Sequence, residues 1–336
     1  MNEKWNMRNL LSCIDKLYVG KFLFLEHVEK GFLSKNIILK SGNIKYFLKK
    51  YRFDNEERIK EIHSVKKYFS DRGIPVILPI FTKDKKTYFS FGNDFYALFP
   101  FVYHKQFERG ALNNSAIVSL GKMLGRIHLV GREADVLIKE KFKTWNREKI
   151  LEKIALIENE IEKVSTLTDF DKIALESIKT KRRLVLLNHL GFENFNLPCD
   201  HLVHGDYLDH NVFFDVENNV SFVFDFEKTE YCPRTQELFR SMLYSLSGNF
   251  QEEDFEKMRL YLKSYSKIYP ISKEELTEGL KMFFIRAMHN AWVESEHYLK
   301  NNNRVDIFLK MDNDRLQYFS QYYEDFEKRI FSSFLQ

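Results

Sequence analysis

The chain has 336 residues, of which 44% are hydrophobic and 15% aromatic, so it is not intrinsically disordered and is long enough for two domains or lobes. Its net charge of +4 is too small to indicate nucleic-acid binding. No stretch approaches the ~20 apolar residues of a membrane helix. Three widely spaced cysteines (Cys13, Cys199 and Cys232) indicate free thiols. We therefore expect a cytoplasmic protein without a membrane partner.

The charge is distributed unevenly along the chain. Residues 1–100 contain 19 Lys and Arg against 11 Asp and Glu, whereas the remainder contains 33 against 37. This asymmetry fits a nucleotide bound by the first part and a basic small molecule bound by the second. Ordinary scatter of surface charge explains it equally well.

The first hundred residues have mainly strand character after a short amphipathic helix at 7–18. Segments 36–39 and 44–51 predict a hairpin that turns at Gly42-Asn43. In its second strand, Phe47, Lys49 and Tyr51 alternate onto one face. Lys49 is therefore expected to be partly buried and to need an anionic partner.

A helix is predicted over 54–73, and it carries Glu57 and Glu61 one turn apart, where either could reach a strand lysine. Pro75 and Pro79 make 74–81 an edge or irregular strand. Segments 87–91 and 95–99 predict a second hairpin. The strand signal stops after Phe101, so we expect a β-rich lobe at 1–101 and a second lobe at 102–336.

The second lobe is predicted to be mainly helical, with helices at 115–131, 147–164, 180–190, 236–246, 252–268, 272–299 and 305–334. Glycines on one face of the 115–131 helix predict close packing against a neighbour. His128, near the end of that helix, is interpreted as a hydrogen-bonded core histidine.

A polar cluster surrounds a short predicted hairpin formed by residues 212–214 and 220–224. Asp206 and Asn211 precede its first strand, and Asp225 follows its second. Two carboxylates and a carboxamide are thus brought to one end of the hairpin. Hard cations such as Mg²⁺ prefer oxygen ligands of this kind and share them with substrate phosphates.

Several motifs resemble the aminoglycoside phosphotransferase and choline kinase superfamily. The run H-G-D-Y-L-D-H-N at 204–211 resembles its catalytic loop, V-F-D-F-E at 223–227 its metal-binding segment, and R-T-Q-E-L at 234–238 the motif that follows. The runs Y-F-L-K-K-Y, L-F-P-F and L-G-K-M-L-G-R-I-H, all nearer the N-terminus, are similar too. The resemblance implies an α+β, two-lobed protein-kinase-like fold. Its β-rich N-lobe has one main helix, and its helical C-lobe carries the catalytic hairpin.

The resemblance also implies an ATP-dependent phosphotransferase that moves the γ-phosphate to a hydroxyl group, with GTP as an alternative donor. Asp206 would orient the hydroxyl and accept its proton, and Asn211 and Asp225 would hold Mg²⁺. Lys49 would bind the α- and β-phosphates, oriented by Glu61 or, as second choice, by Glu57. The remaining implied roles are adenine binding by the backbone of Phe99, Phe101 and Val102, and support of the catalytic loop by His204, Arg234 and Glu237.

The acceptor is expected beside Asp206, and an amine-bearing compound such as an aminoglycoside would suit the acidic residues near it. Candidate acids are Asp209, Glu230, Glu294 and Glu296, although the last two could equally belong to a solvated helix face. Choline, homoserine and methylthioribose are alternative acceptors. A catalytically silent binding or coat protein of the same fold is the alternative from another class.

Three departures from the family pattern and one rival motif remain. The expected phosphate loop at 29–34 has one glycine, so its backbone and Ser34 would have to substitute. Glu227 stands where many kinases carry glycine, and Glu237 replaces the usual aspartate. The rival is a zinc site, but the spacing of Cys199, His204, His210 and Cys232 matches no standard zinc module.

Overall fold

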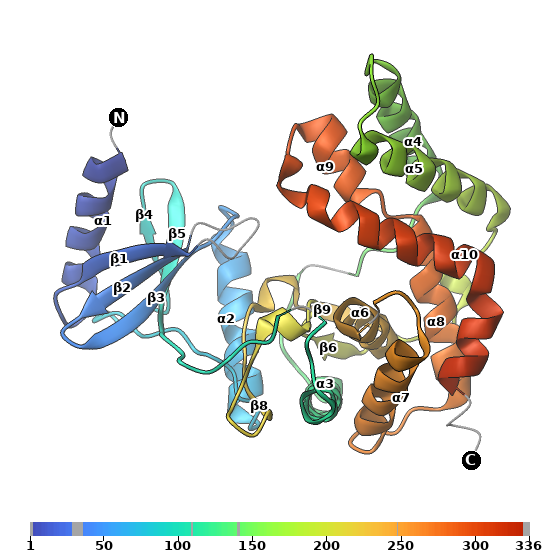
Figure 1. Cartoon of the computed structure of the whole chain (residues 1–336). Helices are drawn as coiled ribbons and strands as arrows, with labels where there is room; N and C mark the ends of the chain where they lie inside the picture. The colour runs from blue at the N-terminus through green and yellow to red at the C-terminus, as the bar shows by residue number, and fades with distance from the viewer. Residues whose placement is uncertain (1–2, 29–35, 109, 140–141, 247, 332–336) are drawn as a thin grey trace.

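The structure is a computed structural model that describes residues 3–28, 36–108, 110–139, 142–246 and 248–331 (Figure 1). A β-rich N-lobe is followed by a mostly helical C-lobe, as the sequence predicts. The expected phosphate loop, including Ser34, lies outside the described residues. Because β5 ends at Pro100 and α3 begins at Asn114, residue 101 is kept as the proposed lobe boundary.

One antiparallel sheet forms the N-lobe, with strand order β1-β2-β3-β5-β4. Its strands are β1 (Leu23–Val28), β2 (Asn36–Ser41), β3 (Ile44–Lys50), β4 (Phe89–Phe91) and β5 (Asp94–Pro100). Helix α1 (Glu3–Leu17) packs on one face, where Leu10 and Ile14 meet Leu39 and Leu48. Alternation along β3 therefore turns Lys49, the neighbour of Leu48, toward the opposite face.

Helix α2 (Glu56–Asp71) lies on that opposite face, between the sheet and the C-lobe (Figure 1). Its N-cap is Asn55, whose side chain accepts a hydrogen bond from the N–H of Arg58. The irregular strand predicted after α2 forms a single bridge, between Val76 and Val223. The N–H of Val223 donates to the carbonyl of Pro75 at 2.8 Å, and the N–H of Ile80 donates to the carbonyl of Leu98 in β5 at 2.7 Å. The segment therefore connects the C-lobe hairpin to the N-lobe sheet.

The C-lobe contains α3 (Asn114–Arg132), α4 (Arg147–Glu162), α5 (Asp169–Leu187), α6 (Arg234–Leu246), α7 (Glu252–Ser266), α8 (Lys273–Met288), α9 (Trp292–Lys300) and α10 (Leu309–Phe331). Helices α4, α5 and α9 project from the rest of the lobe (Figure 1). Close packing of α3 is confirmed, since a Cβ at Gly121 would lie 2.6 Å from the carbonyl oxygen of Tyr261 on α7.

The main differences from the predicted helix boundaries lie in the C-lobe. Helix α5 begins at Asp169 rather than residue 180, because Thr168 and Asp171 form a capping box that the sequence analysis missed. The helix predicted over 272–299 is two helices, since α8 ends at Met288 and α9 begins at Trp292. The last helix begins at Leu309, after a 3₁₀ segment over Asn303–Phe308.

The predicted catalytic hairpin is present as β7 (Val212–Phe214) and β8 (Val220–Val223). A second small sheet pairs β6 (His201–Val203) with β9 (Glu230–Cys232), and the sequence analysis did not predict it. Strands of three residues are too short for a pattern of alternation to emerge. Together the two sheets flank the catalytic loop. None of the helices within the described ranges is both long and apolar enough to span a membrane.

Candidate active site

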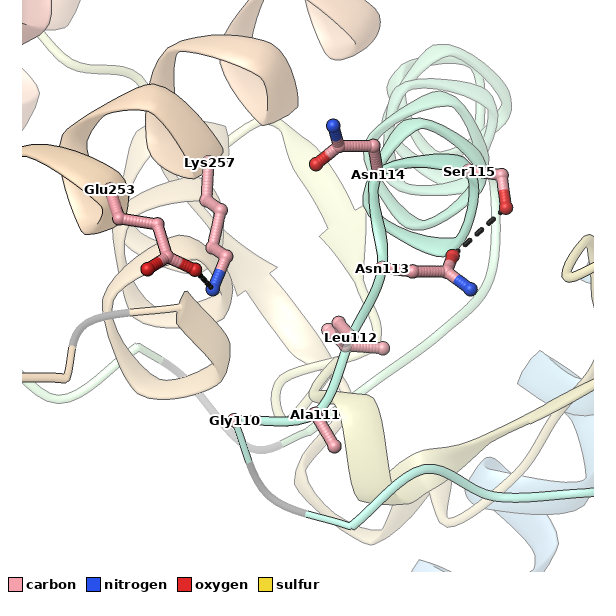
Figure 2. A pocket seen from close by; sticks show the side chains of 8 residues that line it. All are labelled: Gly110, Ala111, Leu112, Asn113, Asn114, Ser115, Glu253 and Lys257. Carbon is pink, nitrogen blue, oxygen red and sulfur yellow. Dashed lines mark hydrogen bonds and ion pairs between the residues drawn. The ribbon is translucent and has the colours of Figure 1, made fainter.

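A cleft of about 2460 Å³ is lined by residues of both lobes, and it contains Lys49, Asp206, Asn211 and Asp225. A smaller recess of about 680 Å³ lies where the N-terminus of α3 approaches α7 (Figure 2). Among its polar groups, Lys257 pairs with Glu253 at 2.6 Å, and Asn113 caps α3. The recess contains no predicted site residue, so the cleft is the candidate active site.

The carboxylate of Asp206 lies between two cations. Lys228 Nζ is 2.8 Å from Oδ2, and Arg240 Nη2 is 2.6 Å from Oδ1. Burial would raise the pKa of Asp206, but the charges of Arg240 and Lys228 outweigh it and hold the pKa well below its usual value. Asp206 is thus ionised at neutral pH and accepts hydrogen bonds.

His204 fixes the loop that carries Asp206. The backbone N–H of Asp206 donates to His204 Nδ1 at 3.2 Å, so Nδ1 is unprotonated and Nε2 donates to the carbonyl of Phe224 at 2.7 Å. Burial lowers the pKa of His204, which keeps the ring neutral. The predicted role in pinning the loop therefore agrees with this geometry.

Glu237 holds the same loop by hydrogen bonds to its backbone. Its carboxylate accepts the backbone N–H groups of His204, Gly205 and Tyr207 at 3.1, 2.5 and 3.3 Å. Gly205 has φ +85°, and a Cβ there would meet the carbonyl oxygen of Lys228 at 1.9 Å, so only glycine fits. His128 contacts Glu237 at 3.1 Å and the hydroxyl of Tyr265 at 2.8 Å, in line with a hydrogen-bonded core histidine.

Arg234 does not brace the catalytic loop, contrary to the prediction. Its guanidinium pairs with Glu275 at 2.6 Å, donates to the carbonyl of Pro270 at 2.9 Å, and lies 4.1 Å from the ring centre of Tyr269. Arg234 therefore joins the start of α6 to α8. Glu237, one turn later on α6, is the residue that points to the loop.

Asn211 and Asp225 offer oxygens to the cleft. The Nδ2 of Asn211 donates to the carbonyl of Asp206 at 2.8 Å, which leaves its side-chain oxygen as an acceptor. Asp225 has φ +64°, a conformation that non-glycine residues rarely adopt and that is concentrated at functional sites. Glu227 lies beside it, because both acids contact Lys49. Carboxylate and amide oxygens are the ligands that Mg²⁺ prefers, so these residues fit a magnesium site.

Lys49 lies 2.7 Å from Asp225 Oδ1 and 2.8 Å from Glu227 Oε1. Burial would lower the pKa of Lys49, but the two carboxylates outweigh it and raise the pKa. Neither helix glutamate occupies the predicted position at Lys49. Arg58, one turn earlier on α2, pairs with Glu61 at 3.1 Å, and Lys139 pairs with Glu57. The carboxylate that orients Lys49 in this structure is therefore on the C-lobe.

A second buried lysine, Lys66 of α2, also lines the cleft. Its Nζ donates to the carbonyl of Ile77 at 3.2 Å and lies 4.2 Å from the ring centre of Phe99. Burial lowers the pKa of Lys66 to about 7, and the charge of Lys49 adds to that shift. The pKa values of Lys49 and Lys66 shift in opposite directions because Asp225 and Glu227 contact Lys49 and do not contact Lys66.

The predicted adenine-binding residues, Phe99, Phe101 and Val102, all line the cleft. Phe99 belongs to β5, where it pairs with Phe47, whereas Val102 follows the end of that strand. Within the described part of the chain, the backbone of Val102 forms no hydrogen bond. Its N–H and C=O are therefore available to the edge of a base.

Most of the predicted acceptor-binding acids lie elsewhere. Glu294 is buried, with its carboxylate 2.6 Å from Lys181 and 2.7 Å from the hydroxyl of Ser177. Glu296 pairs with Lys300, one turn later on α9. Asp209 is buried and accepts the N–H of His210 at 3.0 Å. Of the four, Glu230 alone is among the residues that line the cleft.

Four cationic residues that no sequence motif indicated also line the cleft: Lys228, Arg240, Arg286 and Arg304. Arg240 lies three residues after Glu237, so both side chains project from the same face of α6. Glu237 contacts the backbone of the 204–207 loop, and Arg240 contacts the carboxylate of Asp206. Arg286 and Arg304 carry no local motif. Only the packing of α8 and of the 3₁₀ segment at 303–308 brings them to the site.

Comparison with known structures gives the fold. The chain is similar to an amicoumacin kinase (16% identity, TM-score 0.60, covering 94% of this chain and 96% of that one). It is also similar to an aminoglycoside phosphotransferase from Alicyclobacillus acidocaldarius (13%, 0.61, 94% and 95%) and to choline kinase from Cryptosporidium parvum (12%, 0.62, 98% and 100%). No curated protein sequence matches the chain.

The predicted fold class, α+β and protein-kinase-like, is confirmed by these neighbours. The sequence itself matches a family over residues 25–266, which include Lys49, the catalytic loop, Asp225 and Glu237. That match covers more than half of the chain. The chain therefore belongs to the phosphotransferase enzyme family.

Proposed function

We propose that the protein transfers the γ-phosphate of ATP to a hydroxyl group of a small molecule. The observation that carries this proposal is the joint placement of Lys49, Asp206, Asn211 and Asp225 in one cleft. Phosphoryl transfer depends mainly on positioning and on neutralising charge, and these residue types supply both.

Nucleotide binding is assigned to the N-lobe side of the cleft. Solved structures with the same fold include an amicoumacin kinase with AMP-PNP and Ca²⁺ and a spectinomycin phosphotransferase with ADP. In this chain, we assign adenine binding to the backbone of Val102, which forms no hydrogen bond within the described residues, and binding of the α- and β-phosphates to Lys49. A phosphate can replace Asp225 and Glu227 as the partner of Lys49 and free both acids.

A magnesium ion would be held by Asn211 and Asp225, with Glu227 as a further oxygen ligand that the sequence analysis did not assign. When bound, the ion neutralises charge on the nucleotide phosphates. The backbone N–H of Phe224 donates to the carbonyl of Asn211 at 3.1 Å, which ties the segment before Asp225 to Asn211.

Asp206 would orient the acceptor hydroxyl and take its proton as the bond to phosphorus forms. Its low pKa suits orientation more than early proton removal, because the carboxylate is a weak base. Lys228 and Arg240 contact Asp206 from both sides, so they would also meet negative charge on the transferred phosphoryl group. Glu237 and His204 act by holding the loop.

The amine-bearing acceptors expected from the sequence, including aminoglycosides and choline, required acidic residues in the cleft. Three of the four proposed acids do not line it, so the structure offers little support for an amine. The silent binding protein remains the rival function. It would keep the same cleft but show no acceptor-dependent loss of ATP.

The test is calorimetric titration with a non-hydrolysable ATP analogue, with and without Mg²⁺. We expect Mg²⁺-dependent binding to the wild-type protein and its loss in Asp225→Ala. The matched control is Asp84→Ala, at an exposed aspartate outside the cleft. Absence of nucleotide binding by the wild type would refute the proposal.

A catalytically silent binding protein could also bind the nucleotide, so ADP formation is measured next with a panel of hydroxyl compounds. Stimulation by any one acceptor, abolished in Asp206→Asn, would exclude that rival.

A further inference from the structure

Several basic residues line the cleft that contains Asp206, the proposed site of the acceptor hydroxyl. They include Arg240 of α6, which contacts Asp206, Arg286 of α8 and Arg304 of the 3₁₀ segment. Lys228 adds a fourth cation next to Asp206. Asp206 can balance only one of the two cations that it contacts.

Arg286 is the most informative of these residues. Its Nη1 is buried and, within the part of the chain that the structure describes, has no hydrogen-bond partner. The guanidinium lies over the ring of Phe142, 4.4 Å from its centre, and forms no ion pair with any described carboxylate. Burying a guanidinium N–H without an acceptor costs about 1–3 kcal/mol or more, so such a group indicates a missing anionic partner.

Burial lowers the pKa of Arg286, an effect that Glu230 partly offsets and that the charge of Arg240 reinforces. Arg240 and Arg286 are therefore close enough to repel each other. An anion placed between them would remove that repulsion as well as satisfy Arg286 Nη1.

Arg304 extends the basic surface. Its side chain is exposed, and no described residue forms an ion pair with it. The one aspartate of α10 that lines the cleft, Asp312, already pairs with the buried Arg315 at 3.1 Å. Asp312 is thus engaged, and Glu230 is the other acid whose charge acts on Arg286, whereas neither Arg286 nor Arg304 forms an ion pair within the described residues.

Aromatic side chains also line the cleft near these arginines. Trp292 and Phe308 line the cleft with ring centres 6.0 Å apart, and Tyr244 lies 4.8 Å from the guanidinium carbon of Arg240. Flat apolar surfaces of this kind accept the carbon face of a small ligand.

We infer that the acceptor is an anionic hydroxyl compound, one that carries a carboxylate or a phosphate bound by Arg286 and Arg304 while its hydroxyl group lies at Asp206. The inference rests on the proposed kinase function, and it replaces an amine-bearing acceptor with one of opposite charge. Arginine suits this role because its planar fork binds both oxygens of a carboxylate or phosphate.

The test fills the nucleotide site with Mg²⁺ and the non-hydrolysable ATP analogue, and then titrates three probes by calorimetry. These are inorganic phosphate, 3-hydroxypropanoate and 3-aminopropan-1-ol. We expect one or both anions to bind, and the amine not to bind. The tighter of the two anions distinguishes a phosphate from a carboxylate acceptor.

Variants at two arginines locate the site. Arg286→Met should weaken anion binding about tenfold or more, and Arg286→Lys should restore part of it. Arg304→Met, at an exposed position, should weaken it less and guards against misfolding of the buried variant. Arg183→Met makes the same charge change on an exposed residue of α5 outside the cleft and should have no effect.

Four results would overturn the inference. They are binding of the amine in preference to both anions, binding of none of the three probes, unchanged anion affinity in both arginine variants, and an equal loss in Arg183→Met. Failure of the kinase proposal is seen separately, because the analogue would then not bind in a Mg²⁺-dependent way.

Discussion

The two ends of the cleft differ in how their charges are satisfied. At the nucleotide end, Lys49 forms ion pairs with Asp225 and Glu227. Arg52 forms a further ion pair with Glu227 at 3.0 Å. At the acceptor end, Arg286 Nη1 has no hydrogen-bond partner among the described residues, and the exposed Arg304 forms no ion pair with any of them. Lys49 and Arg52 are therefore paired before any ligand arrives, whereas Arg286 and Arg304 are not paired within the described residues. A nucleotide must therefore displace the carboxylates that pair with Lys49, whereas an anionic acceptor would form the first ion pair with Arg286.

The largest expected effect comes from removing the carboxylate between the two ends. Asp206→Asn keeps the side-chain size but removes the charge that orients the hydroxyl, so kcat should fall about 10²- to 10⁴-fold. Affinity for the ATP analogue, measured by calorimetry, should change little. A variant with near-normal turnover would show that Asp206 is not the catalytic residue.

The next largest effect separates structural acids from acceptor-binding acids. Glu294→Gln leaves Lys181 charged and buried without its partner, so we expect a loss of about 3–5 kcal/mol in the free energy of unfolding. Glu296→Gln removes a helix-surface pair and should cost about 0.5 kcal/mol or less. Urea denaturation measures both. If Glu294→Gln is stable and instead raises KM for the acceptor, the acid binds substrate after all.

A smaller effect concerns the partner of Lys49. Glu227→Gln should raise KM for ATP about tenfold, because Glu227 contacts Lys49 and is a proposed metal ligand. Glu61→Gln should change it by less than about threefold, because Glu61 pairs with Arg58. The reverse order would mean that α2 moves on nucleotide binding to bring Glu61 to Lys49.

The smallest effect is a pH dependence that originates at Lys66. The pKa of Lys66 is about 7 in the folded protein and higher in the unfolded chain. At a pH between these two values, Lys66 is mostly deprotonated in the folded protein but protonated in the unfolded chain. Lys66 therefore destabilises the fold below pH 7, and this cost fades as the pH rises toward 10. Lys66→Met should raise the melting temperature most at pH 7 and least at pH 10. Equal effects at both pH values would contradict the assignment.

The catalytic loop and the hairpin were predictable because their residues are adjacent in sequence. His204 through Asn211 and the strand before Asp225 form a local unit, so short-range spacing was enough. Glu237 was also within reach, because it follows closely on the start of α6.

What the sequence did not yield depends on contacts between distant segments. Glu227 reaches Lys49 across 178 positions of the chain, and no local pattern indicates which acid will do so. Glu294 was predicted to bind the acceptor or to lie on a solvated helix face, yet α9 buries it against Lys181 of α5. The short strands β6 and β9 and the break between α8 and α9 were missed for the same reason. Tertiary packing decides each of them.

The most direct test of the charge difference between the two ends is the ratio of kcat/KM for acceptors matched in length but opposite in charge. ADP formation would be followed with 3-hydroxypropanoate and with 3-aminopropan-1-ol, in the wild type and in Arg286→Met. We predict about a tenfold or greater preference for the anion in the wild type and loss of that preference in the variant. Preference for the amine, unchanged by the substitution, would contradict the account.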